Sequence, residues 1–159
     1  ELLKIKTTNE FEELEGLYKE GSNPVKREDI SASLKGKLNI SNHLREILQN
    51  AEEEVIVCTN AKEIFSKLKL FQQTFAKLNK ANIKIKMGLS GDDELIKELE
   101  EKLDVKIKKV NVNAKFFIID RKEILFYINK SSDEEDIAIW LNSEFFAESF
   151  ASMFEIALR

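Results

Sequence analysis

Apolar residues recur along the chain at two spacings, and these spacings predict alternating strands and helices. Short β-branched or alternating runs predict four strands, at 29–36, 55–59, 83–87 and 105–110. Apolar positions three and four residues apart predict three helices between them: from Asn39 or Ser41 to about 50, from about 60 to 80, and from Asp92 to about 103. Helical crossovers connect parallel strands, so this part of the chain predicts parallel pairing. The glycines at 88–91 predict a turn.

The last third of the chain shows a different pattern. Apolar runs at 114–120 and 123–128 are separated only by Arg121 and Lys122, which predicts a tight hairpin. The sequence then predicts a polar loop at 131–136 and a strand at 137–141. A final helix follows, capped by Asn142 or Ser143. A hairpin imposes antiparallel pairing, so the predicted fold class is α/β, with a mixed β-sheet flanked by helices on both faces.

The N-terminal segment is predicted to be separate from this sheet. Apolar residues at helical spacing predict a helix over 8–20, which the Gly-Ser-Asn-Pro sequence at 21–24 ends. We therefore expect a linker or dimerisation helix at 1–22 and one domain at 29–159. The chain opens at Glu1 without a methionine, so we also expect further sequence upstream.

The composition narrows the choice of function. The chain has 159 residues, of which 43% are hydrophobic and 34% are charged, and its net charge is -4. This acidic balance argues against nucleic-acid binding by the segment itself, because phosphate contacts need positive charge. A single cysteine, Cys58, and a single histidine, His43, exclude metal sites built from several thiolates or imidazoles, and no metal or cofactor is predicted. No apolar run approaches the roughly 20 residues of a membrane span, which favours a cytoplasmic location without a membrane partner.

One motif points to a known family. The sequence N-A-K-F-F-I-I-D at 113–120 has the spacing H-x-K-x-x-x-x-D that marks the phospholipase D superfamily, with Asn113 in the position of the histidine. This motif, the hairpin, and I-W-L-N-S at 139–143 before a final helix together resemble the TrmB-type archaeal transcriptional regulators. The resemblance covers about 29–157. It implies a phospholipase D-like fold in an effector-binding domain.

The resemblance also implies what chemistry the motif has lost. In active phospholipase D enzymes two such motifs meet, and a histidine attacks phosphorus. The amide of Asn113 is neither nucleophilic nor basic, so it cannot perform this step. The glycine-serine pair expected after the motif is replaced by Tyr127 and Ile128. The chain holds one motif, so an active form would need a dimer. We therefore predict no catalytic residue and no enzyme activity.

Five residues are predicted to bind a ligand instead: Asn113, Lys115, Asp120, Trp140 and Asn142. Lysine and aspartate without histidine would hold an anionic or hydroxyl-rich ligand, and an indole at a strand end could stack on a sugar-like one. Each residue also has a structural interpretation. Lys115 could be a polar strand start, Asp120 the first residue of a turn, and Trp140 a core residue. His43 is expected to be exposed on its helix and Cys58 to be buried.

These observations predict a non-catalytic effector-sensing and dimerisation domain of a TrmB-like regulator. The expected partners are a second copy of the chain, through helix 8–20 and the C-terminal helix, and an unknown small effector that is sugar-like or anionic. DNA is expected to bind only through a winged helix upstream of Glu1. Two alternatives remain open, a phospholipase D-type phosphodiesterase that acts as a homodimer, and an oligomerisation module without a ligand.

Overall fold

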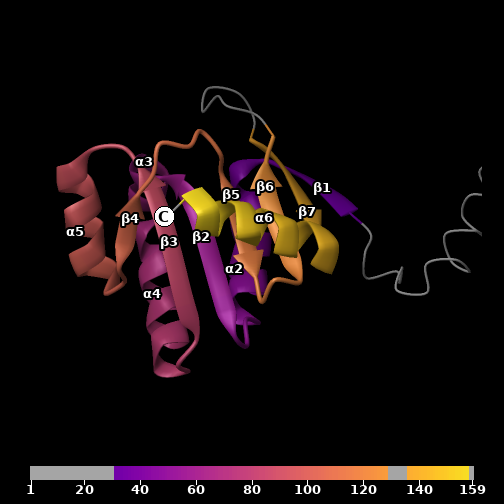
Figure 1. Cartoon of the computed structure of the whole chain (residues 1–159), viewed down its shortest axis with the longest axis horizontal. Coiled ribbons are helices and arrows are strands. Elements are labelled where there is room, and N and C mark those ends of the chain that lie inside the picture. The colour runs from indigo at the N-terminus through magenta and orange to yellow at the C-terminus, as the bar shows by residue number, and fades with distance from the viewer. Residues whose placement is uncertain (1–30, 129–135, 158–159) are drawn as a thin grey trace, which may run out of the picture. The chain divides into compact units, whose positions relative to one another are not determined.

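The computed structural model describes residues 31–128 and 136–157 (Figure 1). The predicted helix over 8–20, the linker at 1–22 and residues 131–135 of the predicted polar loop lie outside the described residues. Asp136, the last residue of that loop, is buried rather than solvated, and its carbonyl accepts a hydrogen bond from Gly36 N–H at 2.9 Å.

Seven strands form one mixed sheet. They are β1 (Ser31–Lys35), β2 (Glu54–Asn60), β3 (Lys84–Ser90), β4 (Ile107–Lys109), β5 (Phe116–Ile119), β6 (Glu123–Tyr127) and β7 (Ile137–Leu141). Their order across the sheet is β1-β7-β6-β5-β2-β3-β4. The pairs β2·β3 and β3·β4 are parallel, and all others are antiparallel. The prediction of a mixed sheet, with an antiparallel meander in its C-terminal part, is therefore confirmed.

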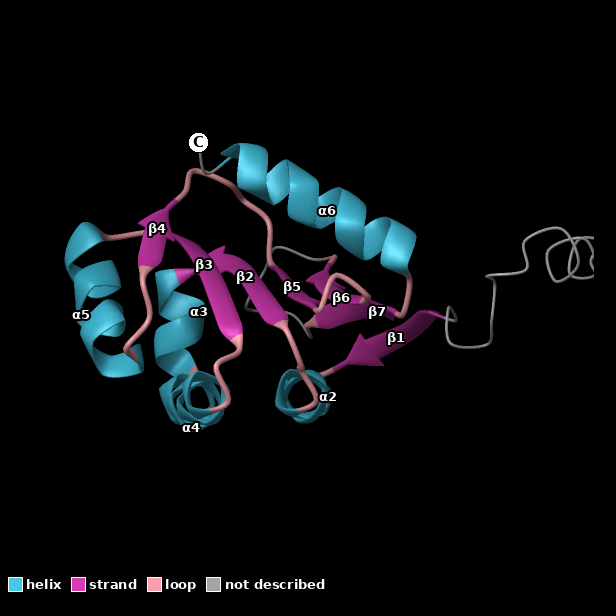
Figure 2. Cartoon of the chain, turned by 60° about the horizontal axis from the view of Figure 1, so that its bottom comes forward, coloured by secondary structure: helices cyan, strands magenta, loops and turns pink. Residues whose placement is uncertain are grey.

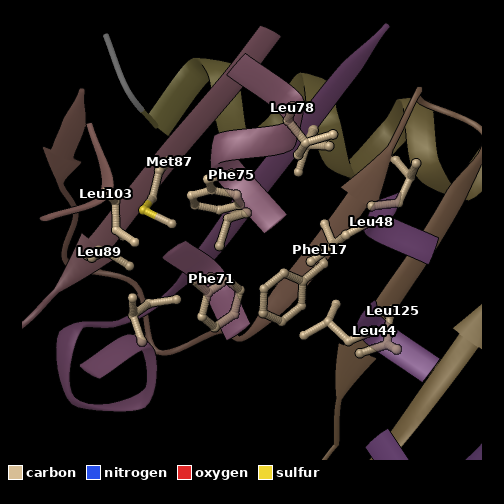
Figure 3. Packing of buried hydrophobic residues seen from close by; sticks show 14 of the residues in the cluster. Leu44, Leu48, Phe71, Phe75, Leu78, Met87, Leu89, Leu103, Phe117 and Leu125 are labelled. Atoms are coloured by element: carbon tan, nitrogen blue, oxygen red, sulfur yellow. The ribbon is translucent and has the colours of Figure 1, made fainter. Parts of the chain in front are cut away.

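Helices cover both faces of this sheet, as predicted (Figure 2). The helices are α2 (Lys37–Gln49), α3 (Ala61–Ser66), α4 (Leu68–Lys80), α5 (Asp93–Leu103) and α6 (Glu144–Ala157). Helices α2 to α5 share one core cluster, in which Phe71 of α4 packs against Phe75 of the same helix and stacks on Phe117 of β5 (Figure 3). Helix α6 covers the other face with a second, smaller cluster.

The alternation of side chains along the strands assigns them to the two clusters. In β2, Val55 and Val57 belong to the larger cluster, whereas Ile56 and Cys58 belong to the cluster under α6. All four are buried, which explains why this strand reads as a continuous apolar run. Burial also raises the pKa of the Cys58 thiol to about 11.

Two helix boundaries differ from those predicted. Helix α2 begins at Lys37, before Asn39 and Ser41, because Gly36 has a φ of 90° that turns the chain directly from β1 into the helix. The predicted helix over 60–80 is two helices, since α3 ends at Ser66 and α4 begins at Leu68. Asn60 caps α3 by accepting a hydrogen bond from Glu63 N–H at 2.8 Å.

The prediction of a turn over 88–91 is wrong for residues 88–90 and correct only for Gly91. Residues 88–90 continue β3, and only Gly91, with a φ of 124°, turns the chain. Gly88 instead provides space, because a Cβ atom there would lie 2.9 Å from Phe154 Cε1 and 3.1 Å from Val110 Cγ1. The missing side chain allows Phe154 of α6 to pack directly on the strand.

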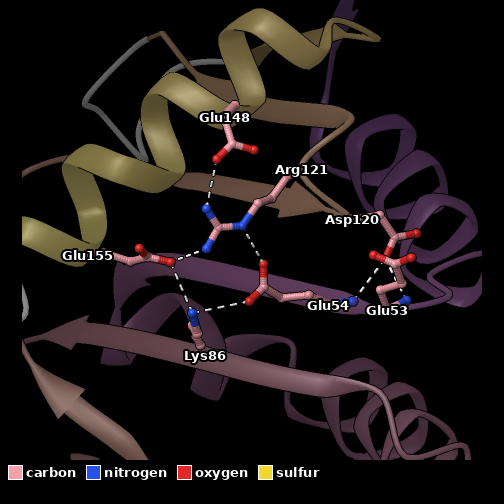
Figure 4. Close-up of polar contacts among 7 residues, drawn as sticks. All are labelled: Glu53, Glu54, Lys86, Asp120, Arg121, Glu148 and Glu155. Carbon is pink, nitrogen blue, oxygen red and sulfur yellow. Dashed lines mark hydrogen bonds and ion pairs between the residues drawn. The ribbon is translucent and has the colours of Figure 1, made fainter.

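Ion pairs also attach α6 to the sheet (Figure 4). Arg121 donates to Glu54 at 2.9 Å and to Glu148 of α6 at 3.0 Å. Its remaining nitrogen donates to Glu155, which also belongs to α6. Lys86 Nζ lies 3.0 Å from Glu155 Oε1 and 3.2 Å from Glu54 Oε2. The two cations thus connect α6 with β2, β3 and the hairpin turn.

Acidification should weaken this attachment. The hydrogen bond from Lys86, and then that from Arg121, hold the pKa of Glu155 below its ordinary value. A carboxyl with a lowered pKa adds stability above its unfolded-state pKa, and that stability is lost as the pH falls through the folded-state value. Below about pH 4.5, the melting temperature of the wild type should therefore fall more steeply than that of Glu155→Gln. Calorimetric melting curves that stay parallel over this range would contradict the prediction.

Candidate functional site

A cavity of about 520 Å³ lies at one end of the sheet, where β2 and β3 end and β5 begins. Asn60 and Ser90, the last residues of these two parallel strands, line it together with Asn113 and Lys115. In open α/β sheets, ligands bind outside the carboxyl ends of the strands. The topology therefore places the first half of the motif where this class of fold binds its ligands.

Aromatic rings form one wall of the cavity. Phe116, Phe126 and Phe150 line it, one each from β5, β6 and α6. The rings of Phe126 and Phe150 are stacked with centroids 6.1 Å apart, and those of Phe116 and Phe150 are 5.8 Å apart. This wall offers a ligand an apolar, planar surface.

Charged and polar groups gather around Lys115, one of the residues that line the cavity. Lys115 Nζ lies 3.6 Å from Glu63 Oε2, and Lys67 Nζ lies 3.1 Å from Glu63 Oε1. Lys67 also donates a hydrogen bond to the Tyr127 hydroxyl at 3.1 Å, and Lys115 Nζ lies 5.5 Å from the Tyr127 ring centroid. One carboxylate thus holds two ammonium groups, of which Lys67 is the closer.

The pKa values of this group fix its charges at neutral pH. Burial alone would raise the pKa of Glu63, but the charges and hydrogen bonds of Lys67 and Lys115 leave it below its ordinary value. Burial would lower the pKa of Lys67, but its interactions with Tyr127 and Glu63 leave it raised. Burial raises the pKa of Tyr127. Glu63 is therefore ionised, Lys67 is charged, and Tyr127 keeps its proton to donate.

A buried hydroxyl without a hydrogen-bond partner in the described structure lies beside the cavity. Thr59 lines the cavity and is only 1% exposed, and its Oγ1 has no hydrogen-bond partner among the described residues. Buried polar groups are normally paired, so this hydroxyl leaves one hydrogen bond unmade beside the cavity. No group of three or more His, Cys, Asp or Glu side chains that could hold a metal ion occurs in the described part of the chain.

Asp120 does not belong to the cavity, which corrects the prediction that it lies there with Lys115. Asp120 comes directly after β5, at the end of that strand far from the cavity. It lies in the hairpin turn, in which Lys122 N–H donates a hydrogen bond to Ile119 C=O at 3.0 Å. Its carboxylate accepts hydrogen bonds from the backbone N–H groups of three consecutive residues at 2.8–3.0 Å: Glu52, Glu53 and Glu54. Three adjacent amides that point at one anion form an anion-binding nest, so Asp120 anchors the hairpin to the start of β2.

Trp140 and Asn142 also lie outside the lining of the cavity. Trp140 packs against the larger core cluster and donates a hydrogen bond to Glu123 at 2.9 Å, as its core interpretation predicts. Asn142 lies between β7 and α6. The prediction of an exposed His43 is wrong, because its half-buried ring meets Trp140 edge to face with centroids 5.0 Å apart. Of the five predicted residues, the structure brings together only Asn113 and Lys115.

Sequence reasoning missed Thr59, Glu63 and Lys67. Thr59 and Asn60 close a buried strand, and in an α/β sheet such positions mark the ligand-binding edge. This signal could have identified Thr59 from the sequence. The contacts of Glu63 and Lys67 with Lys115 and Tyr127 cross between distant segments, and no local pattern reveals them.

A comparison of the sequence with protein-family models gives a match over residues 32–158. The matching family is the N-terminal subdomain of the effector-binding domain of the transcriptional regulator TrmB. The chain belongs to the TrmB family of transcriptional regulators. No curated protein matches the chain in sequence.

Solved structures place this TrmB-family domain in the phospholipase D-like fold. TrmBL2, an archaeal chromatin protein, superposes with a TM-score of 0.64 at 16% identity, over 96% of this chain and 60% of TrmBL2. NUC, a phospholipase D family member from Salmonella typhimurium, has a TM-score of 0.60 at 12% identity, over 80% of this chain and 94% of NUC. NucT from Helicobacter pylori has a TM-score of 0.62 at 13% identity, over 81% of this chain and 95% of NucT. The predicted fold and family are thus confirmed.

The comparisons support a domain of a transcriptional regulator whose fold is also found in a phospholipase D family member. The chain spans 60% of the length of TrmBL2. Within the described residues, no helix is long and apolar enough to cross a membrane.

Proposed function

We propose that this domain senses a small effector for a TrmB-type regulator and is not an enzyme. The effector occupies the cavity at the carboxyl ends of β2 and β3. TrmBL2 is described as binding DNA in a novel mode; for this chain, a winged helix upstream would contact the operator, and the regulator would act in the cytoplasm as a homodimer.

The single observation that carries this proposal is the arrangement of charge around Lys115, which lines the cavity. Two ammonium groups, those of Lys67 and Lys115, share the one carboxylate of Glu63. Lys115 is the more distant and lines the cavity, so its charge is the less compensated. With Asn113 as a neutral hydrogen-bonding group and aromatic rings in the lining, the site suits an anionic or hydroxyl-rich ligand.

The absence of catalysis follows from the residues that face the cavity. Asn113, which stands in the sequence motif where the phospholipase D enzymes have a histidine, lines the cavity, and its amide cannot attack phosphorus. His43, the one histidine of the chain, packs on Trp140 rather than lining the cavity. A phosphodiesterase would need an imidazole that neither position supplies.

Exposed apolar residues on α6 support the homodimer. Phe145, Met153 and Ile156 are 77%, 56% and 62% exposed, on a helix whose opposite side covers the sheet. Neighbouring exposed apolar side chains often mark a surface that another chain covers. This outer side of α6 is the part of the predicted dimer interface that the structure describes.

Replacing Lys115 should abolish effector binding without unfolding the domain. A panel of glucose, glucose 6-phosphate and inorganic phosphate is added to the wild type, Lys115→Gln and the exposed control Lys122→Gln. Ligand at about 100 times its dissociation constant stabilises the folded state by about 2.7 kcal/mol, so at least one compound should raise the melting temperature of the wild type and the control but not of Lys115→Gln.

The same three proteins test the alternatives with bis-p-nitrophenyl phosphate. Turnover that disappears in Lys115→Gln would establish a phosphodiesterase and overturn the proposal. If no compound shifts the melting temperature while sedimentation shows a dimer, the ligand-free oligomerisation module is correct instead.

A further inference from the structure

A second cavity of about 500 Å³ lies in the helix layer, between α2 and α4, and the effector site does not use it. The residues that line it are all polar or charged: Arg45, Gln49, Gln73, Thr74 and Lys77. All except Thr74 are exposed. Figure 2 shows the two helices side by side on the face of the sheet opposite α6. We call this hollow the α2–α4 groove.

The two helices that border the groove are strongly basic. They carry five basic residues, Lys37, Arg45, Lys69, Lys77 and Lys80, against the single acidic residue Glu46. Helix α5 has the opposite balance, with five acidic and two basic residues. The net charge of -4 therefore conceals a separation of charge between neighbouring helices. A locally positive surface can attract an anionic partner even when the whole chain is acidic.

The basic groups around the groove have no acidic partner within the part of the chain that the structure describes. Among residues 31–128 and 136–157, no ion pair involves any of the five. Lysines elsewhere are paired, as Lys102 is with Glu98 at 3.0 Å and Lys109 is with Asp93 at 2.7 Å. The charges beside the groove thus remain available to a partner.

The spacing of these groups fits an extended ligand. On α4, Lys69, Gln73 and Lys77 follow one another at intervals of four residues, and on α2 Arg45 and Gln49 do the same. At 1.5 Å per residue, Lys69 and Lys77 are about 12 Å apart along the helix axis. The phosphates of one DNA strand advance about 3.4 Å per nucleotide along the duplex axis while the strand winds around it, so two charges this far apart meet different phosphates.

We infer that the α2–α4 groove binds the phosphodiester backbone of double-stranded DNA without reading its sequence. Arg45 and Lys77 make the charged contacts, with the guanidinium able to bind a phosphate through two hydrogen bonds. The amides of Gln49 and Gln73 donate further hydrogen bonds to phosphate oxygens. Duplex DNA is the polyanion that a member of a transcriptional-regulator family meets. This contact is separate from the effector cavity and adds to any contact by an upstream domain.

The basic residues have a simpler explanation that the test must exclude. Lys77 and Lys80 lie in the last turn of α4, where positive charge stabilises the negative end of the helix dipole. On that explanation their removal lowers only the melting temperature. Arg45 and Lys69 lie outside the last turns of their helices, and the dipole does not account for them.

The experiment measures binding of the full 159-residue chain to a fluorescein-labelled 20-base-pair duplex by anisotropy, between 25 and 200 mM NaCl. The test variant is Arg45→Gln/Lys77→Gln, and the control is Lys97→Gln/Lys106→Gln, which removes the same charge from exposed sites outside the groove. Each phosphate contact contributes about 0.9 to the slope of log K against log salt, so the test variant should lose about 2 from the slope and bind about tenfold more weakly at 50 mM. The control should bind as the wild type does.

Other outcomes would overturn the inference. These are no binding by the wild type at 25 mM NaCl, equal weakening in the control, or a lower melting temperature of the test variant with unchanged binding. If an unlabelled RNA duplex or polyglutamate displaces the labelled DNA as well as unlabelled DNA does, the groove does not select DNA and the inference is wrong. Lys115→Gln separates this inference from the proposed effector site, because it should leave DNA binding intact whether or not it abolishes ligand binding.

Discussion

Replacing Asp120 with alanine should lower the free energy of unfolding by about 3 kcal/mol, since hydrogen bonds to a charged acceptor contribute about 1.5–3 kcal/mol each and those of Asp120 are partly exposed. The carboxylate holds three backbone amides at the start of β2. Asp120 also has a φ of 55°, a conformation that aspartate tolerates better than alanine does. Urea unfolding, followed by circular dichroism, measures the loss.

Two further substitutions separate these contributions. Asp120→Gly removes the backbone strain together with the hydrogen bonds, so it should cost less than Asp120→Ala by the strain alone. Asp120→Asn keeps one acceptor oxygen for the amides of Glu53 and Glu54 and should cost about half as much as alanine. Equal stability of the wild type and Asp120→Ala, which loses the hydrogen bonds without relief of strain, would show that the amide contacts contribute nothing.

Replacing Gly88 with alanine should destabilise the domain by about 2 kcal/mol, within the range of about 1–3 kcal/mol for overpacked cores. The added methyl group would meet the ring of Phe154 at 2.9 Å and the side chain of Val110 at 3.1 Å. Helix α6 would have to move away from the sheet, or the ring would have to leave its rotamer. The measurement is again the free energy of unfolding in urea.

Truncation of the ring supplies the control for Gly88. In Gly88→Ala/Phe154→Leu the clashing ring atoms are absent, so the double variant should lose less stability than the sum of the two single variants. Additive losses would mean that the clash is absorbed elsewhere and that Gly88 does not determine the position of α6.

The spacing of apolar residues predicted the strands of the sheet, because each strand must place apolar side chains on its buried faces. The continuous apolar run at 55–59 became the central strand β2, and the run-turn-run pattern after 113 became the hairpin. Gly88 misled the prediction, since two glycines three residues apart are typical of a turn. Only the packing of Phe154, more than sixty residues away, shows why the strand needs glycine there.

The candidate site was predictable only in part, because a motif gives the spacing of residues but not the direction in which each points. Lys115 and Asp120 share the motif, yet β5 separates them, so that one lines the cavity and the other anchors a turn. The hydrogen bonds of Asp120 to three backbone amides give this aspartate a structural role that does not depend on Asn113 or Lys115. Glu63 and Lys67 join the site through tertiary contacts that follow from the crossover topology.

The pairing of β1 with β7 has a consequence for the order of folding. Leu34 lies opposite Ala138, so the strand that opens the domain has its neighbour more than a hundred residues later. Contacts of such long sequence separation form slowly, because the loop between them must close first. During synthesis, β2, β3 and β4 can pair through their short crossovers before β7, the strand that pairs with β1, has been made. The first strand of the domain is therefore among the last to join the sheet.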